Sequence, residues 1–81
     1  MDTHAQAAAT TYYVTCKRDS RVAWLSGPYD DHADAAAMVE DVRRWANQAD
    51  PWTEFDAFGT ASITGAPIGR PLAYDRAVMG G

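Results

Sequence analysis

The sequence predicts a small α+β domain with the order β-β-α-β, in which one helix packs on one face of a three-stranded antiparallel sheet. Two short segments rich in β-branched and aromatic residues, separated by a polar stretch, predict a β-hairpin. An 18-residue segment with apolar residues three and four positions apart predicts an amphipathic helix. Since the chain has 81 residues, these elements belong to a single domain.

The hairpin comprises residues 11–16 (TYYVTC) and 22–27 (VAWLSG), joined by the polar residues 17–21. Alternation along a strand places Tyr12, Val14 and Cys16 on one face, which we expect to be the core face. The second strand carries large apolar residues on both faces. We expect Gly27 and Pro28 to end it.

The helix is predicted over residues 32–49, where apolar side chains recur on one side and no glycine or proline interrupts the pattern. We expect the helix to stop at Asp50, because proline at position 51 disfavours a helical conformation in the residue before it. The expected apolar stripe contains Ala35, Met38, Val42, Trp45 and Ala49.

A third strand is predicted over residues 58–64 (FGTASIT), and the helix before it reverses the chain direction. The expected strand order is therefore 2-1-3, which leaves strands two and three as unprotected edges through which a homodimer could form. We expect flexible termini at residues 1–10 and 65–81, around a domain of residues 11–64. The segment after residue 64 contains two prolines, several glycines and no periodicity.

The acidic cluster before the helix has two interpretations, a metal site or a helix N-terminus. Asp31 fits the N-cap position, and Asp34, three residues later, fits the partner position of a capping box. A metal ion needs roughly three or four converging ligands, and neighbours such as Asp30, Asp31 and His32 cannot surround one ion unaided. We therefore expect helix capping, no metal and no cofactor.

Cys16 is the only cysteine, so the chain can form neither an intrachain disulfide nor a cysteine-based zinc site. As a nucleophile it would have only His32 as a plausible base, and its place on the expected core face favours a buried, unreactive thiol. Because the common nucleotide-binding and hydrolase motifs are also missing, the sequence predicts a protein that is not an enzyme.

The net charge of −4 is unevenly distributed, because residues 30–56 carry eight acidic and two basic side chains. An acidic chain is repelled by phosphate, so nucleic acid is not expected as the main ligand. A basic protein surface would suit the acidic helix face, which consists of Asp34, Glu40 and Asp41. The first residues lack signal-peptide character, and no apolar run approaches the ~20 residues that span a bilayer. We therefore expect a cytoplasmic protein.

Two further groups of residues are candidates for binding. Aromatic side chains gather after the helix at positions 45, 52, 55 and 58. They form either a structural plug or a partner-binding aromatic rim, defined as Trp52, Glu54 and Phe55, since Trp and Tyr are common in interaction hot spots. The polar turn contributes Lys17, Arg18 and Arg21, which lie beside sheet aromatics and could contact single-stranded nucleic acid.

The two segments YYVTCKRDSRVAWLSGPYDDHADA and DPWTEFDAFGTASI resemble small uncharacterised proteins carried on plasmids, integrative elements and phages of proteobacteria. The resemblance covers residues 12–64. It implies a mobile-element setting, in which small acidic proteins include anti-CRISPR proteins that occlude a surface of an interference complex. The function expected from this resemblance is inhibition of a bacterial defence complex by protein–protein contact. The alternatives are a nucleic-acid-binding accessory protein that uses the basic turn and a structural homodimer.

Overall fold

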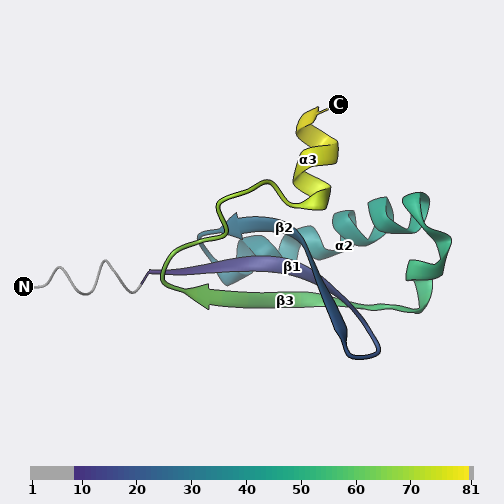
Figure 1. The fold of residues 1–81 in the computed structure, drawn as a ribbon, viewed down its shortest axis with the longest axis horizontal. Helices are drawn as coiled ribbons and strands as arrows, with labels where there is room; N and C mark the ends of the chain where they lie inside the picture. The colour runs from purple at the N-terminus through teal and green to yellow at the C-terminus, as the bar shows by residue number, and fades with distance from the viewer. Residues whose placement is uncertain (1–8, 81) are drawn as a thin grey trace, which may run out of the picture.

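The computed structural model describes residues 9–80, so the predicted flexible N-terminus lies outside the described residues except for positions 9 and 10. The regular elements are β1 (Thr10–Arg18), β2 (Arg21–Tyr29), α2 (His32–Ala49), the 3-10 helix η1 (Pro51–Phe55), β3 (Ala57–Thr64) and α3 (Ala73–Gly80). The strand order is β2-β1-β3, and β1 runs antiparallel to both neighbours. The predicted fold class and strand order are confirmed, with α2 lying across one face of the sheet (Figure 1).

The face of the sheet toward α2 forms the expected core. Val14 is fully buried and Cys16 is nearly so, and they meet a helix stripe whose buried members are Ala35, Val42 and Ala46. The helix has the predicted limits, and its buried residues lie on the side that the sheet covers. These small side chains allow the helix to pack closely on the sheet.

The opposite, outer face of β1 is also covered. Tyr13 is fully buried, and the ring of Trp24 meets it edge-on with 5.0 Å between ring centroids. The chain after β3 crosses this face toward the far edge of the sheet (Figure 1). There the backbone N–H of Ile68 donates to the Tyr13 hydroxyl at 3.0 Å, and Leu72 is buried.

The prediction of a flexible tail over residues 65–81 is therefore wrong for residues 65–80. Its apolar residues show no period because they come from a crossing segment and a short helix, rather than from one long regular element. Ile68 contacts β1, Tyr74 contacts α2 and Leu72 is buried, none of which a local sequence pattern contains. The folded unit accordingly extends from residue 10 to residue 80, beyond the predicted limits of 11–64.

β2 does not stop at Gly27, as the sequence predicted, but continues through a cis Gly27–Pro28 peptide to Tyr29. The pairing of β1 with β2 contains two register shifts. At one of them Thr15 pairs with Trp24 and Val14 pairs with Ser26, so Leu25 has no partner residue on β1. Proline is compatible with this position because β2 is an edge strand. The predicted alternation of β2 residues is thus broken at Leu25.

α3 packs along β2 and contacts α2. The Asp75 carboxylate accepts hydrogen bonds from the Gly27 backbone N–H at 2.9 Å and from the Ser26 hydroxyl at 2.8 Å. Tyr74 meets Trp45 of α2 edge-on, with 5.6 Å between ring centroids. These contacts connect the C-terminal helix to both layers of the fold.

Asp31 occupies the predicted N-cap position of α2, but its side chain makes no capping hydrogen bond, so the predicted capping box is wrong. The backbone carbonyl of Asp31 instead accepts from the N–H groups of Asp34 and Ala35, at 3.1 and 3.3 Å. Asp34 still lies in the first turn, where a carboxylate is favoured by the positive end of the helix dipole.

Candidate protein-interaction surface

η1 carries two large aromatic side chains that face solvent. Trp52 is 70% exposed and Phe55 is 77% exposed, with 6.0 Å between ring centroids. Residues three apart eclipse one another in a 3-10 helix, so both rings project from the same side of η1. The interpretation of a core plug is therefore wrong for these two residues, whereas Trp45 packs on Tyr74.

The N-terminal end of η1 is fixed to the end of α2 by side-chain hydrogen bonds. Asp50 ends α2 and caps η1, where its Oδ1 accepts from the Trp52 backbone N–H at 3.1 Å. The Thr53 hydroxyl donates to the side chain of Asn47 and also contacts the Asp50 carbonyl at 2.9 Å. The aromatic rim is consequently held in one position.

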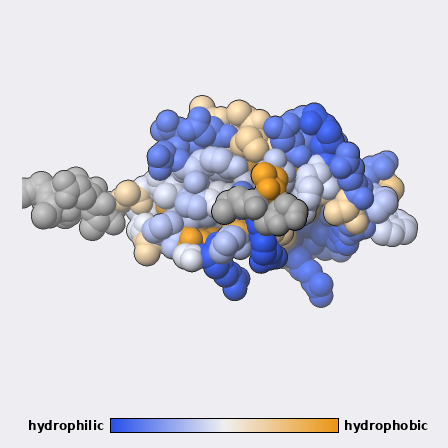
Figure 2. Space-filling view, turned by 90° about the horizontal axis from the view of Figure 1, so that it is seen from above, coloured by the Kyte–Doolittle hydropathy of each residue, from blue (hydrophilic) through white to orange (hydrophobic). Residues whose placement is uncertain are grey.

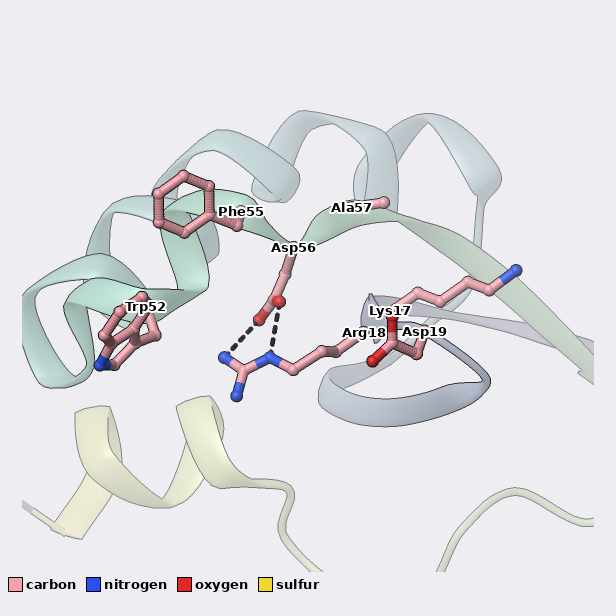
Figure 3. Close-up of a pocket in the computed structure, with 7 residues that line it drawn as sticks. All are labelled: Lys17, Arg18, Asp19, Trp52, Phe55, Asp56 and Ala57. Atoms are coloured by element: carbon pink, nitrogen blue, oxygen red, sulfur yellow. Dashed lines mark hydrogen bonds and ion pairs between the residues drawn. The ribbon is translucent and has the colours of Figure 1, made fainter.

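The C-terminal end of η1 is fixed by Asp56, whose side chain is only 4% exposed. Its carboxylate accepts two hydrogen bonds from Arg18, Nε to Oδ1 at 2.7 Å and Nη2 to Oδ2 at 2.9 Å (Figure 3). The Cys16 thiol donates to the same Oδ2 at 3.3 Å. The end of β1 and the start of β3 are thereby joined through a two-point, charge-assisted contact.

The Arg18 guanidinium holds the pKa of the Asp56 carboxyl below its ordinary value. The pKa of Cys16 is raised to about 11, first by burial and then by its hydrogen bond to Asp56. A thiol with such a pKa stays protonated at neutral pH and is a poor nucleophile. His32, the candidate base, instead stands edge-on to Tyr12 and hydrogen-bonds Thr60 at 3.1 Å.

We expect the stability of the protein to fall as the pH rises from about 9 to about 11, partly because of Cys16. The thiol has an ordinary pKa of 9.0 and a folded-state pKa of about 11, so only the unfolded chain loses this proton within that window. A Cys16→Ser variant keeps a donor for Asp56 but does not ionise there. Urea unfolding across this pH range should show a smaller decline for the variant, and parallel curves would contradict the assignment.

An open hollow of about 660 Å³ separates the aromatic rim from the tip of the hairpin. Its lining comes from η1, the start of β3 and the hairpin, and in Figure 3 the Arg18 side chain spans it toward Asp56, while the Lys17 ammonium points away. The hollow thus joins two exposed aromatic rings to a hairpin tip that bears both charge signs, because Asp19 and Lys17 also line it. Such an arrangement suits a macromolecular partner better than an enclosed small molecule.

The acidic helix face is partly neutralised by its own helix. Glu40 pairs with Arg43, and Asp41 pairs with Arg44 at 3.2 Å. Both pairs are exposed, and the two residues of each pair lie about one helical turn apart. Each pair therefore reduces the negative field that a basic partner would meet. Asp34 remains exposed near the start of the helix.

The predicted nucleic-acid contacts lie together at the hairpin end, where Arg18 shares one hollow with Lys17 and another with Arg21. Arg18 is engaged by Asp56, and Arg21 lies opposite it in the β1–β2 register. The Lys17 ammonium points away from Arg18 in Figure 3, although both residues line the same hollow. Of the sheet aromatics near the turn, Tyr13 is fully buried and cannot stack on a base, whereas Tyr12 and Trp24 are half-buried.

Among residues 9–80, no group of three His, Cys, Asp or Glu side chains is placed to hold a metal ion. In the same range, every helix is too short or too polar to cross a bilayer. Comparison with protein-family models, curated proteins and solved structures gave no significant match.

Proposed function

We propose that this chain is a non-enzymatic protein-interaction module that binds a basic protein surface through its aromatic rim, Trp52, Glu54 and Phe55. The observation that supports the proposal is the exposure of Trp52 and Phe55 on a helix whose two ends are fixed by Asp50 and Asp56. A solvent-facing pair of large aromatic rings carries an unfavourable hydration free energy that a partner would remove.

The fixed position of η1 favours binding, because little conformational entropy is lost when a rigid segment docks. Aromatic side chains bury roughly 150–250 Å² each and are frequent in interaction hot spots. The exposed ring of Trp52 can accept a cation–π contact, and the exposed carboxylate of Glu54 can pair with Lys or Arg. Together with the acidic excess of residues 30–56, these groups match an apolar pocket bordered by basic residues.

The finer form of the proposal is that the partner is the basic surface of a bacterial defence complex, such as a CRISPR effector, and that binding inhibits it. Its support is the resemblance of residues 12–64 to proteins of mobile elements. The coarser form, a basic protein partner, rests on the exposed aromatic rim and on the acidic excess of residues 30–56.

The combined change Trp52→Ala and Phe55→Ala is expected to weaken partner binding by roughly thirtyfold or more, since loss of an aromatic hot spot costs about 2 kcal/mol or more. The partner is captured with the tagged full chain from a proteobacterial lysate that contains an active CRISPR system, with and without nuclease. The affinity is then measured with the purified complex. The matched control is Val78→Ala, which shortens an apolar side chain that is 60% exposed but lies outside the aromatic rim.

Effector subunits that remain bound after nuclease treatment, and that are lost only from the rim variant, would support both forms of the proposal. Equal binding by the rim variant and the control would contradict the role of the aromatic rim. In that case, charge reversal at Asp34, Glu40 and Asp41 tests the acidic helix face. If the captured proteins are lost on nuclease treatment, the result would instead favour nucleic-acid binding through the basic turn, Lys17, Arg18 and Arg21.

A further inference from the structure

The outer edge of β3 is an open edge in the described part of the chain. Within residues 9–80, β3 pairs only with β1. Its eight residues, AFGTASIT, include no charged residue and no proline. Alternate residues of an antiparallel strand direct their N–H and C=O groups away from the paired neighbour, so this edge can accept another strand.

The opposite edge of the sheet is protected by several features that natural proteins use against edge pairing. β2 contains two register shifts, Arg21 and Pro28, and α3 packs along it. The Asp75 carboxylate occupies the Gly27 N–H, which a further strand would otherwise use. The surface seen from this side is largely hydrophilic, with small scattered apolar areas (Figure 2).

We propose that a second copy of this chain pairs with β3 in antiparallel orientation, giving a dimer with a continuous six-stranded sheet. Two identical uncharged strands meet without like-charge repulsion, although the chain as a whole has a net charge of −4. A second copy is favoured over an unrelated strand because the pairing is self-complementary. It also closes at two subunits, since β2 offers no equivalent edge.

The symmetry of this pairing restricts its register. Opposite residues of an antiparallel pair point to the same face of the sheet. A two-fold axis normal to the sheet therefore has to pair one β3 residue with the same residue of the second copy, and it cannot lie between two successive residues. The residues nearest the middle of β3 are Thr60 and Ala61. Either axis places both α2 helices on the same face of the joined sheet, because a rotation about the sheet normal keeps each face on its own side.

The dimer would also present two aromatic rims. Each rim lies just before its β3 strand, so antiparallel pairing places the two at opposite ends of a strand pair of about 26 Å, at about 3.3 Å per residue. The two rims of one dimer would bind a partner that has two sites with increased avidity, and only this consequence rests on the proposed function. The dimer itself does not, and Trp52→Ala with Phe55→Ala should leave it intact.

Sedimentation of the full chain at several concentrations tests the proposal. We expect a monomer–dimer equilibrium that Ser62→Lys shifts toward monomer by about tenfold in dissociation constant, because symmetry places each unfavourable lysine contact twice. Ser20→Lys makes the same change in charge at the exposed hairpin turn and should leave the equilibrium unchanged. A monomer at every soluble concentration, or equal effects of the two variants, would overturn the proposal. Circular dichroism checks that both variants are folded.

Cysteine cross-linking locates the axis independently. Thr60→Cys and Ala61→Cys are oxidised separately, and one of them should give a disulfide-linked dimer, since opposed residues near the axis lie within about 4.5–5.5 Å between Cα atoms. The unmodified chain is the control, because its Cys16 is buried against Asp56. A dimer in sedimentation that neither cysteine cross-links would use another surface and would contradict pairing through β3.

Discussion

Replacing Tyr13 with alanine is expected to destabilise this protein by about 3–5 kcal/mol, a large part of its total stability. The ring is fully buried between β1 and the crossing segment of residues 65–72, where it contacts Trp24 and Gly27. Its removal leaves a cavity on the outer face and also deletes the acceptor of the Ile68 N–H. A domain of this length typically has only ~4–12 kcal/mol of total stability, so the alanine variant should unfold at a much lower urea concentration.

The matched variant Tyr13→Phe separates packing from hydrogen bonding. It keeps the ring and loses only the hydroxyl that Ile68 and Thr11 contact, so we expect a loss of about 1 kcal/mol. Urea unfolding at neutral pH measures both variants. If Tyr13→Ala lowered the free energy of unfolding no more than Tyr13→Phe, the segment of residues 65–72 would not be packed on the Tyr13 ring.

Replacing Gly27 with alanine is expected to destabilise the protein by roughly 2–4 kcal/mol, from backbone strain and steric overlap together. Gly27 has φ of 136°, a conformation that residues with a side chain rarely adopt. A Cβ at this position would lie 2.6 Å from Cδ2 of Tyr13 and 2.9 Å from the carbonyl oxygen of Tyr12. Neither atom can move away easily, since Tyr13 is enclosed on both sides and the carbonyl belongs to the central strand.

Gly69→Ala is the control for this change, because a Cβ there meets no atom within 4 Å. It should be neutral or slightly stabilising, since alanine restricts the unfolded chain. Thermal or urea unfolding of the two variants gives the comparison. Similar stability of Gly27→Ala and Gly69→Ala would show that the close approach between β2 and β1 is absent in solution.

The sequence by itself determined the elements whose signals are local and periodic. The alternation around Val14 identified the core face of β1, and the stripe that contains Ala35 and Val42 identified both the helix and its buried side. Proline at position 51 marked the end of α2. The strand order followed from chain direction, because a helix between strands two and three leaves few ways to connect them.

Local patterns also located the aromatic rim, but they could not decide whether Trp52 and Phe55 were buried. An exposed and a buried aromatic residue look alike in sequence, and their exposure depends on where η1 is held. That position is set by Asp56 and Arg18, which are 38 residues apart. Neither residue forms a motif with its own neighbours, so no local signal predicted the contact.

Only the tertiary structure decided the role of the C-terminal segment. Residues 65–80 lack periodicity, which made a flexible tail the natural expectation. Their order instead comes from distant partners: Tyr13 for Ile68, Trp45 for Tyr74, and Gly27 for Asp75. The physical reason is that hydrophobic burial and hydrogen bonding depend on which surfaces the fold leaves uncovered. Those surfaces, the outer face of β1 and the edge of β2, exist only once the sheet has formed.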